Sequence, residues 1–334
     1  MANDLERKGT GFDLAYGSEE EGRSWIGRRG ETVVCEDPVN WPAIKHFCAL
    51  VQDRNPVYWD EAAANVRFGA VPAPPGMLFV WSMPPLWSPE GPTRGPLLAV
   101  RVPLPGNTII NVATESEFVK RALVGDRLML EETIADVSPA KTTGLGRGHF
   151  VTTAMIYRNQ RGEEIARHRN VLFRYGVEAT PSSAETATKP TPAPADGAGD
   201  EAGGRERLPE VVLPVTLRLC VHDAAATRDY FPGHHDRDYA RAQNARDVYL
   251  NTMFFHGFVD RVVTDWAGPE ATIRTRRLRM IAPVCVGDTI RTRSWVLGRR
   301  TDGDCATCDV RVEVRTEHGL GAEAVIACER NSPR

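Results

Sequence analysis

Apolar and polar residues alternate along two stretches of this chain, and short turns separate the alternating segments. In the first stretch the pattern predicts strands at residues 97–104, 108–119, 126–137, 149–159 and 163–175. In the second stretch it predicts strands at residues 271–284, 288–300, 305–316 and 322–330. Strands joined by short turns pair with their neighbours, so the pattern indicates antiparallel sheet. Two further strands are expected ahead of these stretches, at residues 31–36 and 211–220.

Segments whose apolar residues have the spacing of a helix also precede each stretch of strands. Residues 41–51 place four apolar residues on one face of a helix, namely Ile44, Phe47, Cys48 and Val51. Residues 251–266 form an uninterrupted helix candidate in the second stretch. The segment 77–83 looks helical too, but it meets Pro84 and Pro85. Proline inside a helix costs about 3 kcal/mol, so this helix is expected to stop after about two turns.

A change of composition divides the chain. Residues 179–209 are dominated by Ala, Pro, Ser, Thr and Gly, and such a segment buries too little apolar surface to order itself. We therefore predict a disordered linker there, and a loosely ordered lead-in over the polar residues 1–30. The elements before the linker recur after it. The sequence thus predicts an α+β chain of two domains, 31–178 and 210–334, each a sheet wrapped around a helix.

Composition and charge narrow the function classes. The 334 residues are 42% hydrophobic and 25% charged, which is typical of a globular protein, and the formal net charge is −3. This charge favours neither nucleic acid nor an acidic membrane surface as a partner. The chain has no long apolar run and no signal-peptide core near its start, so we expect a cytoplasmic protein.

Cysteine usage gives no sign of disulfides or metal. The seven cysteines are an odd number scattered through a long chain, so they are expected to be free thiols. Cys305 and Cys308 form the only CxxC pair, and no second Cys or His pair has the spacing of a structural zinc site. No metal site is predicted.

The candidate chemistry lies in the loop of residues 227–236. Asp229 precedes His234 by five positions, and Pro232 between them restricts the backbone. Histidine has an ordinary pKa of about 6.5, so it exchanges protons near neutral pH. An Asp and a His held toward one point can grip and activate a single water. On spacing alone, such a pair is more often a solvated loop contact than a catalytic dyad.

The duplicated loops carry a resemblance to a known family. Residues 53–60 read DRNPVYWD, and residues 229–236 read DYFPGHHD. Both are similar to the Gly-Asp-x-Asn-Pro-x-His signature of MaoC-type, R-specific enoyl-CoA hydratases, which have the double or paired hot-dog fold. The resemblance implies that Asp229 and His234 hold the water added to a 2-enoyl thioester. The first copy has Tyr58 in place of His. The ordinary Tyr pKa of about 10 makes it a poor base near neutral pH, so this half is expected to be catalytically silent.

The second copy also departs from the signature. It has Phe231 for Asn, Gly233 for an aliphatic residue and Arg228 for Gly, which argues against a short-chain substrate. Residues 226–243 and 248–269 resemble the small subunit of bacterial steroid side-chain hydratases. Segments of the first half resemble the MaoC domain of their large subunit. The resemblance implies both partners fused in one chain, an acyl-CoA substrate, no cofactor, and a monomer or homodimer.

Four further points enter through this resemblance or remain open. The family takes an oxyanion-binding N–H from the start of its central helix, and the aligned position is Thr252. His234 is the favoured base, although the reverse assignment of acid and base stays open. The basic segment 274–279 either meets CoA phosphates or forms ion pairs and a solvated face. The space left by the short helix at 77–83 either admits a ligand or is filled by Trp81, Leu86 and Trp87.

Two other functions are compatible with the sequence. One is a general R-specific hydratase or an acyl-carrier 3-hydroxyacyl dehydratase. The other is a catalytically inactive hot-dog scaffold that binds a partner. The intact pair of Asp229 and His234 argues against the scaffold, and Phe231 and Gly233 argue against the general enzyme.

Overall fold

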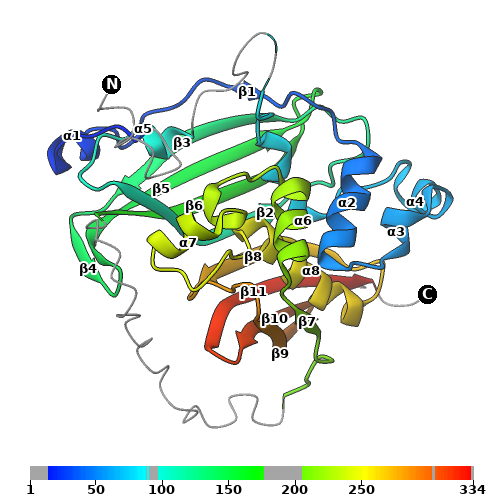
Figure 1. Ribbon diagram of the computed structural model, residues 1–334. Helices are drawn as coiled ribbons and strands as arrows, with labels where there is room; N and C mark the ends of the chain where they lie inside the picture. Colours follow the sequence, from blue (N-terminus) through cyan, green and yellow to red (C-terminus); the bar gives the residue numbers. More distant parts are fainter. Residues whose placement is uncertain (1–13, 88, 90–96, 177–204, 303–304, 332–334) are drawn as a thin grey trace.

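One continuous antiparallel sheet forms the centre of the molecule (Figure 1). The computed structural model describes residues 14–87, 89, 97–176, 205–302 and 305–331. Within these ranges the strand order is β1-β3-β5-β6-β2-β8-β11-β10-β9-β7, and β4 pairs with β5. The strands are β1 Val33–Val34, β2 Thr108–Phe118, β3 Met129–Val137, β4 Lys141–Thr143, β5 Gly146–Arg158, β6 Glu164–Tyr175, β7 Val212–Pro214, β8 Thr272–Met280, β9 Thr289–Asp302, β10 Cys305–Thr316 and β11 Gly319–Asn331.

The two halves of the chain meet at the β2–β8 pair. Ala113 lies opposite Arg279 and Glu117 lies opposite Thr275, so the sheet crosses from one half to the other without a break. The strands on either side of this seam belong to separate halves: β1 to β6 before the linker and β7 to β11 after it. The predicted pair of sheets is therefore a single sheet.

Helices cover one face of this sheet. They are α1 Glu19–Arg23, α2 Trp41–Val51, α3 Pro56–Trp59, α4 Glu61–Phe68, α5 Leu98–Arg101, α6 Leu217–Thr227, α7 Arg237–Ala242 and α8 Thr252–Ala267, with 3-10 turns η2 Pro75–Met77, η3 Val80–Ser82 and η4 Pro232–His234. The long helix α8 is buried along most of its length and packs on β8, β10 and β11. Helices α2 and α6 contact each other and α8 (Figure 1). No helix among the described residues has both the length and the apolar character needed to span a membrane.

Hydrogen bonds repeat between the halves and confirm the duplicated plan. The Gly125 amide donates to the Val39 carbonyl at 2.8 Å, and the Gly287 amide donates to the Val215 carbonyl at 2.9 Å. Helices α2 and α6 occupy equivalent places, and each is followed by a residue in the left-handed conformation, Gln52 and Arg228, both with φ of 57°. The sequence repeat is thus a repeat of backbone geometry.

Two predicted strands are wrong. Residues 97–104 begin with the helical turn α5, which buries Leu98 and Val100 in a small second core. A strand is disfavoured here because Pro103 and Pro105 have no N–H to donate to a neighbouring strand. Residues 211–220 form only the short β7 before α6 begins. The Thr216 side chain accepts from the Leu219 amide and caps α6, a signal that the apolar run concealed.

The predicted lead-in and linker also differ from the structure where it describes them. Leu14 is buried, and the Arg174 guanidinium donates to the Ala15 carbonyl at 2.9 Å, so residues 14–30 are held against the first half. Residues 205–209 belong to the second half, since the Leu208 amide donates to the Ser294 carbonyl at 3.0 Å. Residues 1–13 and 177–204 lie outside the described ranges.

The first half lacks a long central helix. Where the second half has α8, the first has η2 and η3, separated by Leu78 and Phe79. The predicted short helix is therefore two 3-10 turns. Gly76 and Gly257 bring η2 and α8 together, since a Cβ on Gly76 would lie 2.6 Å from the Gly257 backbone. This close approach fixes the 3-10 segment of one half on the central helix of the other.

Candidate active site

The end of α6 and the start of α8 hold the predicted catalytic loop. One face of α6 is buried, and its residues are Cys220, Asp223, Ala224 and Thr227. The side-chain amide of Asn251, the N-cap of α8, donates to the Thr227 hydroxyl at 2.7 Å, and the Asn251 backbone amide donates to the Asp223 carboxyl at 2.8 Å. The left-handed Arg228 then turns the chain, so Asp229 emerges beside the start of α8.

The structure brings Asp229 and His234 together. The Asp229 Oδ1 atom accepts the Phe231 amide at 3.3 Å, which folds the loop back on itself before η4. His234 Nδ1 lies 2.9 Å from the Tyr249 carbonyl oxygen. Because a carbonyl only accepts, Nδ1 carries the hydrogen, and a neutral ring then has its lone pair on Nε2. That Nε2 atom lies 3.6 Å from Asp229 Oδ2.

Thr252 is the first residue of α8, as predicted for an oxyanion-binding amide. The Asn251 side chain accepts from the Phe254 amide at 2.9 Å and caps the helix. The first amides of a helix have no partner within it, and they carry the positive end of the helix dipole. Tyr249, which orients His234, and Asn251, which binds Thr227, both lie just before this position in sequence. These hydrogen bonds hold the loop of Asp229 and His234 next to the start of α8.

Gly233, a departure from the family signature, makes room for an aromatic ring. A Cβ at this position would lie 2.4 Å from the Tyr249 hydroxyl oxygen. The ring of His234 packs edge-on against Tyr249, with centroids 5.0 Å apart, and Phe231 lies 5.5 Å from His234. The aromatic side chains thus fix the imidazole plane, and glycine is required for their close packing.

Comparisons with known proteins identify the family. Residues 24–168 match the model of a FAS1-like dehydratase domain region, and residues 201–318 match that of a MaoC like domain. The chain is 38% identical over 120 residues to the 3-oxo-4,17-pregnadiene-20-carboxyl-CoA hydratase beta subunit of Mycobacterium tuberculosis, covering 93% of that protein and 32% of this chain. The chain belongs to the MaoC-like dehydratase family. This is a family of hydro-lyases, which includes enoyl-CoA hydratases.

Two larger relatives match only in part. A probable enoyl-CoA hydratase alpha subunit of Thermomonospora curvata is 38% identical over 184 residues, 52% of this chain and 58% of that one. The 3-oxo-4,17-pregnadiene-20-carboxyl-CoA hydratase alpha subunit of Mycobacterium tuberculosis is 29% identical over 154 residues, 45% of this chain and 49% of that one. The chain therefore spans about half the length of these two relatives.

Solved structures confirm the fold. A double-hotdog protein of Mycobacterium tuberculosis aligns over 91% of this chain and 96% of its own, with a TM-score of 0.60 and 14% identity. A MaoC-like dehydratase aligns over 93% of this chain and 100% of its own, with a TM-score of 0.69 and 15% identity. The predicted α+β double hot-dog fold is thus confirmed.

The first half of this MaoC-like dehydratase holds the counterpart of the loop that contains Asp229 and His234. Asp53 follows the left-handed Gln52 and accepts the Asn55 amide at 2.8 Å, as Asp229 accepts that of Phe231. Burial, reinforced by the negative charge of Asp265, raises the pKa of Asp53 to about 6. Tyr58 is buried in place of the histidine, and burial raises its pKa well above the usual value.

The first half also lacks the helix amide. The Ala73 amide donates to the Ala122 carbonyl at 2.8 Å. The Leu250 amide makes the equivalent bond to the Val284 carbonyl at 3.1 Å. Two residues beyond each lie Pro75 and Thr252, the first residues of η2 and α8. Proline has no N–H, so an oxyanion would find no donor at this place in the first half.

The sequence did not single out several residues that build the site. Asp223, Thr227, Tyr249 and Asn251 were not identified. Burial raises the pKa of Asp223 well above its usual value, with the charge of Asp229 adding to the effect. Its spacing from Cys220 and Thr227 marks a helix face, but the strand predicted across Cys220 hid that periodicity.

The basic strand of the second half is occupied by ion pairs. Arg276 is completely buried and pairs with Asp260 of α8. Arg274 lies 2.6 Å from Glu329, and Arg279 lies 2.6 Å from Glu323. The structure therefore favours ion pairing over phosphate contact for these side chains.

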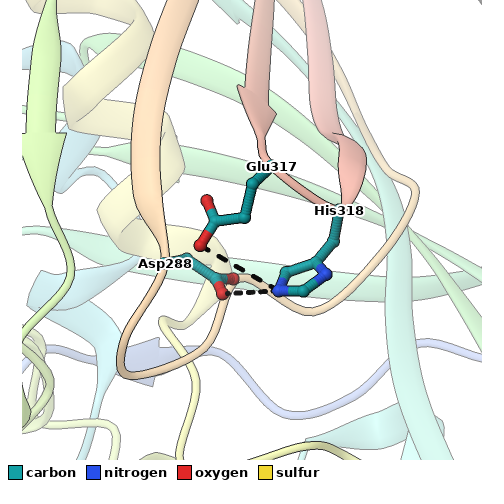
Figure 2. A group of neighbouring side chains, drawn as sticks. All are labelled: Asp288, Glu317 and His318. Atoms are coloured by element: carbon teal, nitrogen blue, oxygen red, sulfur yellow. Dashed lines mark ion pairs between the residues drawn. The ribbon is translucent and has the colours of Figure 1, made fainter.

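One cluster of potential metal ligands lies at a turn of the second half (Figure 2). His318 Nε2 lies 3.6 Å from Asp288 Oδ1 and 4.0 Å from Glu317 Oε1. However, the Arg246 guanidinium donates to both Asp288 oxygens, at 2.8 and 2.6 Å, and the Cys285 amide donates to Oδ2 at 2.8 Å. The Asp288 carboxylate thus already accepts hydrogen bonds that stabilise its turn.

Proposed function

We propose that this chain hydrates a 2-enoyl-CoA thioester to the 3-hydroxyacyl-CoA, and that its acyl group is bulky and derived from a steroid side chain. The observation that carries the reaction is the facing pair of His234 Nε2 and Asp229 Oδ2, 3.6 Å apart. The Tyr249 carbonyl holds the imidazole in the tautomer that leaves Nε2 as an acceptor. Two acceptors at this separation suit a water that donates one hydrogen to each.

The proposed reaction begins with that water. Its oxygen forms a bond to C3 of the enoyl group, and His234 Nε2 takes one of its protons. The electrons of the C2–C3 double bond shift toward the thioester oxygen, which becomes negatively charged. The protonated His234, or Asp229 after proton exchange, then delivers a proton to C2. All atoms of the water end in the product, so no cofactor is consumed.

The developing negative charge requires a donor. Thr252 supplies a backbone N–H at the start of α8, where the helix dipole also favours negative charge. Donors placed where charge appears in the transition state are worth about a hundredfold or more in rate. Thr252 is partly buried, so its amide acts in a medium where such a hydrogen bond is stronger than in water.

The substrate proposal rests on the relatives' names and on space in the first half. Two relatives are hydratase subunits for a steroid carboxyl-CoA, 3-oxo-4,17-pregnadiene-20-carboxyl-CoA. In the first half, two 3-10 turns replace a central helix. Of the side chains that would fill the missing volume, Trp81 is buried, but Leu86 and Trp87 remain 74% and 78% exposed. The shortened segment thus supports a large acyl group.

The test compares two substrates on the purified full chain. A steroidal 20-carboxyl enoyl-CoA and crotonyl-CoA are followed in parallel by loss of the enoyl absorbance. We expect a higher kcat/KM for the steroidal substrate. A preference for crotonyl-CoA would reject the substrate class, and no turnover of either would reject the hydratase in favour of a binding scaffold.

A further inference from the structure

A pocket lies in the silent half, away from the proposed catalytic pair. Its volume is about 150 Å³. It opens between the η2–η3 segment, the residues that follow β2, and the first residues of β8. The side chains that matter here are three apolar ones and three cationic ones: Leu78, Trp81, Ile273, Lys120, Arg121 and Arg274.

The pocket lies at one end of β2, and helix α7, which follows the loop of Asp229 and His234, ends near the other. The pocket includes Phe118, the last residue of that strand. At the other end, the Thr108 hydroxyl donates to the side chain of Gln243, just after α7. Eleven residues of strand separate these ends by about 33 Å. A molecule of benzene size in the pocket would therefore not reach His234.

Arg121 is a partly buried cation whose partners are neutral. It donates to the Thr272 hydroxyl at 2.6 Å and lies over the Phe68 ring at 4.5 Å. In the part of the chain that the structure describes, no carboxylate lies within ion-pairing distance of it. Lys120 and Arg274 differ, since they pair with Glu163 and Glu329. Burial lowers the pKa of Arg121, as expected for a guanidinium short of negative charge.

The catalytic half has no such cations at the equivalent place. The Val119 and Lys120 amides both donate to the Ile165 carbonyl, at 2.9 and 3.1 Å. In the same way, two successive amides after β8 donate to the Gly321 carbonyl. These two amides belong to Ile281 and Ala282, and the next residue is Pro283. Lys120 and Arg121 thus correspond to Ala282 and Pro283, and the charge belongs to the silent half alone.

We propose that this pocket binds a small carboxylate with an apolar body. The Arg121 guanidinium receives the carboxylate, and Leu78, Trp81 and Ile273 contact the body. A guanidinium offers the planar fork that matches a carboxylate, and a buried cation gains most from an anionic partner. A cavity of about 150 Å³ accepts a body the size of benzene. The inference does not depend on the proposed hydratase reaction.

Calorimetric titration of the full chain with benzoate and with neutral benzamide tests the proposal. We expect saturable binding of benzoate and affinity for benzamide lower by about tenfold or more, because the amide forms no charge-assisted pair. This comparison needs no variant. Equal affinities, or no binding of benzoate, would overturn the proposal.

A matched pair of variants locates the site. Arg121→Met is expected to weaken benzoate binding about tenfold. Arg279→Met, which removes the same charge from an exposed position on β8, is expected to leave it within about twofold. Unchanged affinity in Arg121→Met would contradict the assignment. So would competition between benzoate and crotonyl-CoA, because the short acyl group of crotonyl-CoA would stay at the catalytic pair.

Discussion

The two halves of this MaoC-like dehydratase build the same loop with different chemical capacity. Each has a helix, a left-handed residue and an Asp whose carboxyl accepts an amide two residues on. In the second half the Asp229 side chain is 23% exposed and faces His234. In the first half Asp53 is only 7% exposed. The comparison teaches that the backbone of this loop is duplicated, whereas the proposed chemistry depends on a few positions.

The largest expected effect separates the two loops at the position five residues after the Asp. His234→Ala removes the proposed base, so we expect kcat for enoyl-CoA hydration to fall by about a hundredfold or more. Tyr58→Phe, at the equivalent position of the first half, should change kcat by less than about twofold. Steady-state kinetics of the two variants, with circular dichroism to check folding, makes the measurement.

The equivalent position of the first half can be changed to histidine, to test whether that half gains activity. Tyr58→His restores the family residue to the first half, but Pro75 still offers no amide to an oxyanion. Combined with His234→Ala, it should therefore leave the chain as slow as His234→Ala alone. Recovered activity in this double variant would show that the first half lacks only its histidine.

The second prediction tests the helix amide at the start of α8. Thr252→Pro copies the first half's Pro75, and it deletes the backbone N–H while leaving a residue type that suits the first position of a helix. The extended backbone of Asn251, with φ −86° and ψ 171°, accepts a following proline. We expect kcat to fall by about a hundredfold or more.

Thr252→Ser serves as the matched control, because it keeps the amide and the hydroxyl. It should retain kcat within about threefold of the parent chain. If Thr252→Pro folds and keeps full activity, the oxyanion donor lies elsewhere.

The sequence predicted the pattern of strands better than it predicted the elements around the loop of Asp229 and His234. Alternation located β2, β3, β5 and β6 because each has one face against the core. It failed at α6, where a short apolar run fits a strand and a buried helix equally well. That error hid Asp223 and Thr227, whose role in fixing Asp229 depends on helical spacing. Contacts such as Tyr249 with His234 join distant segments, so no local pattern contains them.

The third prediction concerns Gly233, which corresponds to Val57 in the first half. A methyl group here would overlap the Tyr249 ring, which lies where the first half has Pro72. Gly233→Ala should displace the ring and with it the carbonyl that orients His234, so we expect kcat to fall by about tenfold. The second substitution Tyr249→Leu removes the overlap and should recover part of the loss. Failure of the double variant to recover would assign another role to the Tyr249 hydroxyl.

The smallest effect is one of stability, and it tests whether the first half's carboxyl is only a remnant. Burial raises the pKa of Asp53 to about 6, so the folded state favours the neutral acid. Below about pH 4 both states are protonated and there is no penalty. Between about pH 4 and 6 the unfolded chain ionises first, and the stability that the neutral form provides is lost as pH rises.

Asp53→Asn keeps an acceptor for the Asn55 amide but cannot ionise. We therefore expect the free energy of unfolding to exceed that of the parent by about 2 kcal/mol at pH 7, with the difference vanishing toward pH 4. Urea titrations at several pH values measure this difference, and hydration kinetics at pH 7 should stay unchanged. A rate loss like that of His234→Ala would mean that the first loop takes part in turnover after all, and the contrast between the halves would have to be withdrawn.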